Sequence, residues 1–195
     1  MYGANVKTLY RFKKKILNSL AMTKTDIKSN LLKNHQHFIA TIQSLPEEEF
    51  LLSVNNKWSA GQQLDHIYRS VQPMALALAL PKFLLALIFG KANRPSKNYT
   101  ELVEKYKTKL AAGYKVSAKY SPNDIVLSQR DSLGQKLLGS INKVNKRIDS
   151  FSEKDLDNYI LPHPLLGKLT IREMLFFTIY HVQHHEVLTL KNLGK

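Results

Sequence analysis

The sequence predicts an all-α protein built on a bundle of long helices. Apolar residues recur at intervals of three and four along several segments, which is the spacing of one helix face. Capping-box pairs, in which serine or threonine precedes glutamate or glutamine by three residues, mark helix starts at Ser59 and Thr170. No segment shows a convincing alternation of apolar and polar residues, so no strand is predicted.

The composition limits the class of protein. The chain has 195 residues, enough for one domain with a sizeable core. It has no cysteine, so any metal ion must be held by nitrogen and oxygen atoms. The formal net charge of +14 favours an anionic partner, but the lysines are spread along the whole chain and fit a solvated surface better. We expect no specific nucleic-acid partner, because no recognised binding motif is present.

Residues 1–22 are predicted to form a basic amphipathic extension, followed by a helical domain over residues 23–195. The extension contains five basic residues and no acid, and its apolar residues have helical spacing. Such a helix suits a membrane surface or a partner. Packing on the bundle and a start of translation at Met22 are the alternatives. It lacks the continuous apolar core of a secretory signal, and we expect a cytoplasmic protein.

The first two core helices follow from the apolar spacing. The first is expected from about Asp26 to Ser44, with a short helix after Pro46. The second begins at Ser59, where the capping box lies. Pro73 should end or kink it near its last turn, since proline cannot donate a backbone hydrogen bond.

The segment from Met74 to Phe89 is strongly apolar. Pro81 interrupts it, and each half is too short to cross a bilayer. We expect a buried helix that continues into a second short helix. This segment is a candidate for the lining of an apolar pocket or for a homodimer face. A further short, charged helix is expected from Tyr99 to Ala112.

The C-terminal half predicts two long helices separated by a loop. Residues 121–124 (Ser-Pro-Asn-Asp) have the features of a helix start, with proline at the first helical position. The helix after them carries an apolar face from Leu133 to Ile148. Residues 161–164 (Leu-Pro-His-Pro) are expected to form a rigid loop, and the last helix should start near Ile171.

The last predicted helix contains the most informative pattern in the chain. His181 and His185 are four residues apart and therefore lie on one helix face. They share that face with apolar residues, so they should point inward. A buried imidazole needs a partner, which is either a metal ion or a hydrogen-bond network. His66 borders the apolar face of another helix and is a candidate third ligand, which would leave a coordination position open as in catalytic sites.

Other histidines are weaker candidates. His184 is an alternative to His185, because residues three apart also face one side. His35 lies on the apolar face of the first helix and is expected to be a hydrogen-bonded core residue or a group supporting the site. His163 lies either at a pocket mouth or in a simple turn. His37 should face solvent.

The chain resembles the DinB/YfiT-like family of metalloenzymes, and is also similar to its branch that contains bacillithiol S-transferases. The closest match runs from His163 to His185. The matching residues are Trp58-Ser59, His66, the proline–histidine–proline loop with Gly167, Thr170, Arg172-Glu173, His181 and His184-His185.

The resemblance implies a four-helix bundle with up-down-down-up topology. It also implies a divalent metal ion, zinc or nickel, bound by His66, His181 and His185. Such an ion lowers the pKa of a bound water or thiol, so we expect a thiol S-transferase or a hydrolase that acts on a small-molecule substrate. Because the chain has no cysteine, a low-molecular-weight thiol must come from a cosubstrate.

Four polar residues are candidates for supporting roles. Gln62 and Arg69, about one turn before and after His66, are candidates for orienting a ligand. Asp65 and Glu186 are candidate acceptors for the second ring nitrogen of a ligand histidine. The alternative for all four is an ordinary surface position. The rival function is a non-catalytic bundle that binds metal, a membrane or nucleic acid, with structural histidines.

Overall fold

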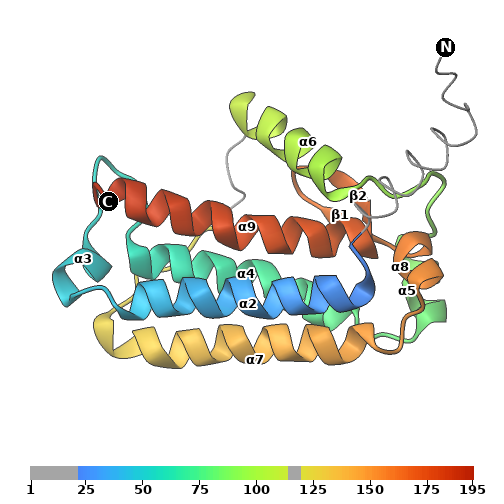
Figure 1. Cartoon of the computed structure of the whole chain (residues 1–195), viewed down its shortest axis with the longest axis horizontal. Helices are drawn as coiled ribbons and strands as arrows, with labels where there is room; N and C mark the ends of the chain where they lie inside the picture. Colours follow the sequence, from blue (N-terminus) through green and yellow to red (C-terminus); the bar gives the residue numbers. More distant parts are fainter. Residues whose placement is uncertain (1–21, 114–119) are drawn as a thin grey trace, which may run out of the picture.

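The computed structural model describes residues 22–113 and 120–195, and this part of the chain is mostly helical, as predicted (Figure 1). The predicted extension over residues 1–22 lies outside it, apart from Met22. Four long helices lie side by side. They are α2 (Lys24–Gln43), α4 (Ala60–Ala77), α7 (Arg130–Ile148) and α9 (Ile171–Asn192).

Shorter elements connect and cover the long helices. Helix α6 contacts α9 on the side away from α2, and the short β1–β2 hairpin also contacts α9 (Figure 1). Helix α3 contacts α4, and α8 contacts the start of α9. These elements are α3 (Glu47–Leu51), α5 (Lys82–Phe89), α6 (Tyr99–Ala111), the 3-10 turn η2 (Leu127–Gln129), α8 (Glu153–Asn158), β1 (Ile160–His163) and β2 (Gly167–Thr170).

The apolar faces of the long helices meet in one core. Leu31 and Phe38 of α2, Leu64 of α4, Ile141 of α7 and Val182 of α9 are all buried there. Their spacing of three, four and seven along each helix is the pattern that predicted the helices. Burial of this apolar surface is the main force that holds the four helices together.

The rigid loop predicted over residues 161–164 is part of a β-hairpin, so the expectation of no strand was wrong here. Ile160 pairs with Thr170 and His163 pairs with Gly167 in antiparallel register. Each strand has only four residues, which is too short for an alternating pattern to stand out. Gly167 has a φ of +78°, a conformation that favours glycine at this turn.

The capping-box predictions are confirmed at both helix starts. The Thr170 hydroxyl accepts a bond from the Glu173 backbone N–H, and the Glu173 carboxylate accepts one from the Thr170 N–H at 2.9 Å. Ser59 and Gln62 exchange the equivalent bonds. Both boxes satisfy backbone N–H groups that a helix leaves free at its first turn.

The helix start predicted at residues 121–124 was wrong, because α7 begins at Arg130 after η2. The side chains of α4 hold this segment instead. The Asn123 backbone N–H donates to Asp65 at 2.8 Å, and Gln62 donates to Asp124 at 3.0 Å. These tertiary bonds compete with a local cap and keep the chain extended along α4.

Helix α4 passes through Pro73 and ends four residues later, at Ala77. None of the described helices is long and apolar enough to cross a membrane by itself; α4 and α5 meet that criterion only together, and they bend by 113° at their junction. Helix α5 is the predicted second short helix, and Leu85 is its buried residue, while Phe83 and Leu87 are 70% and 79% exposed.

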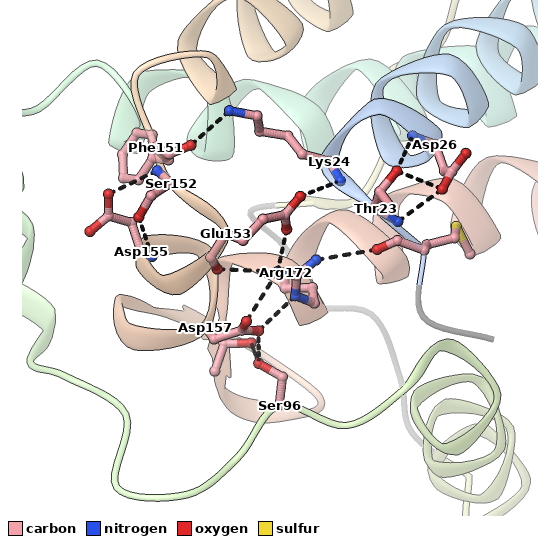
Figure 2. A network of polar contacts seen from close by, with 12 residues as sticks. Thr23, Lys24, Asp26, Ser96, Phe151, Ser152, Glu153, Asp155, Asp157 and Arg172 are labelled. Carbon is pink, nitrogen blue, oxygen red and sulfur yellow. Dashed lines mark hydrogen bonds and ion pairs between the residues drawn. The ribbon is translucent and has the colours of Figure 1, made fainter. Parts of the chain in front are cut away.

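A polar network fixes the start of α9 against α8 and α2 (Figure 2). The Arg172 guanidinium donates to both carboxylate oxygens of Asp157 and to Glu153. Glu153 also accepts from the Lys24 backbone N–H at 2.9 Å. Paired guanidinium–carboxylate contacts have a fixed geometry, so this network sets the position of the helix that carries the histidines.

Candidate metal centre

Helices α4 and α9 run antiparallel, and this arrangement brings the histidines together. Gln63 contacts His185, and one turn further along α4, His66 contacts His181. On the opposite side of the cluster, Met74 contacts Thr178. As residue numbers rise along α4, the numbers of the contacted residues on α9 therefore fall, which is the pattern of antiparallel helices.

His66, His181 and His185 form one buried cluster. The Nε2 atoms of His66 and His181 are 3.3 Å apart. One nitrogen from each of the three rings lies within 4.8 Å of the others. The ring centroids are 4.5–5.1 Å apart. His66 thus converges with His181 and His185, which follow it by more than a hundred positions, as the sequence predicted.

Hydrogen bonds fix the ring orientation of two of the histidines. The His66 Nδ1–H donates to the Tyr120 carbonyl at 2.7 Å, which leaves a lone pair on Nε2. The His185 Nδ1–H donates to the side-chain oxygen of Gln63, which leaves a lone pair on its Nε2 as well. Acceptors of this kind hold metal-binding histidines in the tautomer that presents Nε2 to the ion.

The electrostatic environment keeps the cluster neutral. Burial lowers the pKa of His181 and His185 well below 6.5, and neighbouring histidines lower both further. Burial also lowers the pKa of His66, although the Tyr120 carbonyl and Asp65 oppose this shift. All three rings therefore carry free lone pairs at neutral pH, which is the form that binds metal.

The donor set fits a divalent transition-metal ion. Bonds of about 2.0–2.1 Å to a tetrahedral ion separate two ligand nitrogens by about 3.3 Å. The Nε2 atoms of His66 and His181 already have this separation. Neutral imidazoles suit zinc, nickel and copper better than magnesium or calcium, which prefer oxygen. Three protein ligands also leave a position open for water or substrate.

Aromatic rings enclose the cluster. The Trp58 ring centroid is 4.8 Å from that of His66, and Phe177 stacks on His181 at 4.6 Å. The three histidines line a cavity of about 720 Å³ that extends along α4 and α9 toward α5. Its apolar walls include Met74, Ala77, Phe89, Leu161, Met174 and Phe177. The prediction that the segment from Met74 to Phe89 helps to line an apolar pocket therefore holds for three of its residues.

The alternative ligands predicted from sequence lie outside the cluster. His184 is half-buried, stacks on Tyr180, and also lines the cavity. His163 lies in the cavity wall at the end of β1, and its Nδ1 accepts bonds from the backbone N–H groups of Leu165 and Leu166. Burial lowers the pKa of His163 to about 4, so this ring stays neutral and holds the turn of the hairpin.

The first helix places its two histidines as expected. His35 is fully buried in the core, where its Nδ1–H donates to the Leu31 carbonyl at 2.8 Å. Its Nε2 is buried and has no hydrogen-bond partner among the described residues. The His37 side chain is 74% exposed and contacts Glu186.

The four predicted supporting residues make other contacts. Arg69 pairs with Asp65 at 2.6 Å, and Glu186 accepts from Thr41 at 2.5 Å. Gln62 is held by its capping box and by Asp124. No hydrogen bond joins any of them to the histidine cluster within residues 22–113 and 120–195.

The acceptors that do contact the cluster are Gln63 and the Tyr120 carbonyl, and sequence reasoning missed both. The sequence did offer a signal for Gln63 as an acceptor, because the predicted capping box already engaged the side chain of its neighbour Gln62. Gln63 also lies three residues before His66, on the same helix face. The Tyr120 carbonyl had no sequence signal, since any residue has a carbonyl group.

The fold and the site define a helical bundle whose buried three-histidine cluster lines a cavity. A model of the DinB superfamily matches residues 30–186, well over half of the chain. The protein therefore belongs to the DinB superfamily, as its resemblance to DinB/YfiT-like proteins predicted. Comparisons with curated proteins and with solved structures give no significant match.

Proposed function

We propose that this protein is a metal-dependent enzyme in which His66, His181 and His185 bind one divalent ion, zinc or nickel. The observation that carries the proposal is the convergence of three neutral, buried imidazole nitrogens within 4.8 Å, two of them oriented by hydrogen bonds at the opposite ring nitrogen. The cavity beside them, of about 720 Å³, has the size of a small-molecule site.

We propose that the reaction is transfer of a thiol to an electrophile, as in the bacillithiol S-transferase-like branch. A divalent ion bound here would supply Lewis-acid chemistry, lowering the pKa of a thiol or water that binds to it. The thiol must come from a cosubstrate, since the chain has no cysteine. Metal-dependent hydrolysis is the related alternative, and the substrate screen below separates the two.

The residues around the histidines have separate tasks in this proposal. Gln63 and the Tyr120 carbonyl hold two rings in the metal-binding tautomer. Trp58 and Phe177 restrict the access of water to the cluster, which strengthens electrostatic interactions there. Apolar walls such as Met74 and Met174 bind the carbon skeleton of the substrate.

Metal analysis of the untagged protein tests the site. We expect one zinc or nickel ion per chain after reconstitution, and an affinity more than roughly a hundredfold lower in His66→Ala, because a ligand contributes more than the outer hydrogen bonds that are worth 10–100-fold. His37→Ala is the matched control, since this exposed histidine should leave the metal content unchanged. Equal metal content in the native protein and in His66→Ala would remove His66 from the site.

A substrate screen tests the reaction. Low-molecular-weight thiols are combined with electrophilic acceptors, and ester and amide substrates are tested in parallel. We expect thiol consumption that stops with chelator and returns with metal. Turnover of esters or amides alone would favour hydrolysis. Stoichiometric metal without any turnover would favour the rival hypothesis of a non-catalytic metal-binding bundle.

We also propose the up-down-down-up topology implied by the family. It is supported by contacts of Asn34 with Ile179 and of Thr41 with Glu186, which match α2 and α9 running in one direction. A homodimer through the exposed face of α5, a cytoplasmic location and membrane contact through residues 1–22 stay predictions. Light scattering of the purified protein tests the first of these three.

A further inference from the structure

His35 has an unsatisfied ring nitrogen in the centre of the bundle. The residue is fully buried, and its Nδ1–H donates to the Leu31 carbonyl at 2.8 Å. In the neutral ring, Nε2 is therefore a hydrogen-bond acceptor. It has no partner in the part of the chain that the structure describes. A buried acceptor without a partner is costly and rare, so a group that satisfies it is expected beside the ring.

A small cavity beside His35 has room for one water molecule. Its volume is about 10 Å³, which is the smallest space that holds a water. Four of its lining residues are polar: His35, Ser70, Thr178 and His181. A bound water needs two to four polar partners, and this cavity provides them.

The two hydroxyl groups in this cavity can accept hydrogen bonds. The Ser70 hydroxyl donates to the His66 carbonyl at 2.8 Å, and the Thr178 hydroxyl donates to the Met174 carbonyl at 2.9 Å. Their hydrogens are therefore used within their own helices, and their oxygen lone pairs remain for a donor. Water can donate one hydrogen to His35 Nε2 and the other to one of these oxygens.

His181 completes the set, because its second ring nitrogen can pair with a water in this cavity. In the cluster, His66 donates to Tyr120 and His185 donates to Gln63, each through Nδ1. His181 directs Nε2 at His66, and no hydrogen bond to its Nδ1 is found among the described residues. Its ring also lines the small cavity. His66 Nε2 is an acceptor, so its hydrogen bond with His181 places the hydrogen of the neutral, metal-free His181 ring on Nε2 and leaves Nδ1 as an acceptor. A water there would donate its second hydrogen to His181 Nδ1, which competes for it with the two hydroxyl oxygens.

We propose that a water molecule bound in this cavity links His181 Nδ1 to His35 Nε2, and that His35 is thereby a positioning residue for the third histidine of the cluster. All three rings are then held with Nε2 toward a common point. Burial lowers the pKa of His35 to about 4, so it stays an acceptor at neutral pH. The metal-binding consequence rests on the proposed function, but the link itself does not require a metal.

Nuclear magnetic resonance of the metal-free, full-length protein tests the link directly. The nitrogen resonance of His181 Nδ1 should have the chemical shift of an unprotonated ring nitrogen that accepts a hydrogen bond. His35→Phe should shift or abolish that signal, because the acceptor for the water is lost. His35→Gln should retain it, because its amide oxygen can occupy the position of Nε2. His37→Phe, an exposed neighbour on α2, should have no effect.

Zinc affinity, measured by competition with a chromophoric chelator, tests the consequence. We expect His35→Phe to bind zinc roughly 10–100-fold more weakly, the usual cost of losing such a hydrogen-bond partner. His35→Gln should recover most of the affinity, and His37→Phe should bind as the native protein does. Thermal unfolding of each metal-free variant identifies any general loss of folding. If His35→Phe does not fold, the comparison of His35→Gln with the native protein decides the test.

Two results would overturn the inference. One is a His181 Nδ1 signal that is the same in His35→Phe and in the native protein. The other is zinc affinity that does not respond to His35→Phe. If the native protein binds no zinc or nickel at all, the proposed function fails, whereas the His35–water–His181 link is still decided by the metal-free spectra.

Discussion

Acid should destabilise the metal-free protein, and His35 should account for a defined part of the loss. Burial lowers the pKa of His35 in the folded state from 6.5 to about 4. Between these values the unfolded chain binds a proton that the folded protein does not, so stability rises with pH. The contribution of His35 is fully present above its unfolded pKa and is lost as the pH falls toward about 4.

The magnitude follows from the two pKa values. Between about pH 7 and about pH 5, one histidine with these values lowers the free energy of unfolding by about 2 kcal/mol. His163, whose pKa is also lowered to about 4 by burial, contributes in the same direction. So do His181 and His185, whose pKa values burial lowers strongly.

Urea unfolding at a series of pH values, with a chelator present, isolates the His35 contribution. The difference in stability between about pH 7 and about pH 5 should be about 2 kcal/mol smaller in His35→Phe than in the native protein, because the contributions of the other histidines cancel in the comparison. An unchanged pH dependence in His35→Phe would refute the reasoning.

Three further substitutions test the packing around the site. Glu173→Ala should lower the free energy of unfolding by about 2–4 kcal/mol, measured in urea, because it leaves the Arg94 guanidinium without its carboxylate partner; no loss would mean that the ion pair is replaced by solvent. Gly61→Ala should lower it by about 1–3 kcal/mol, since a Cβ there would lie 2.9 Å from the Phe50 ring, and a melting temperature equal to that of the native protein would contradict this. Leu87→Ser should change the free energy of unfolding by less than about 0.5 kcal/mol, because the side chain is 79% exposed. A larger loss of stability that depends on protein concentration would instead indicate that a second copy of the chain covers α5.

Much of the helical framework could be predicted because it depends on local rules. The spacing of apolar residues and the capping boxes at Ser59 and Thr170 correctly placed the starts of α4 and α9. The same rules failed where tertiary contacts compete with local preference. Asp65 on α4 holds the segment at Asn123 extended, so α7 starts at Arg130 rather than at the predicted cap.

The sequence alone predicted that His181 and His185 face the core and that His66 borders the apolar face of its helix, and the family resemblance grouped the three as one site. Helical periodicity sets the direction of each side chain regardless of its distant neighbours. Tertiary structure decided what those rings contact: Gln63 rather than Gln62, a backbone carbonyl at Tyr120, and a small polar cavity shared by His181 and His35. These contacts depend on the relative position of two helices, to within a fraction of a turn, and no local pattern encodes that position.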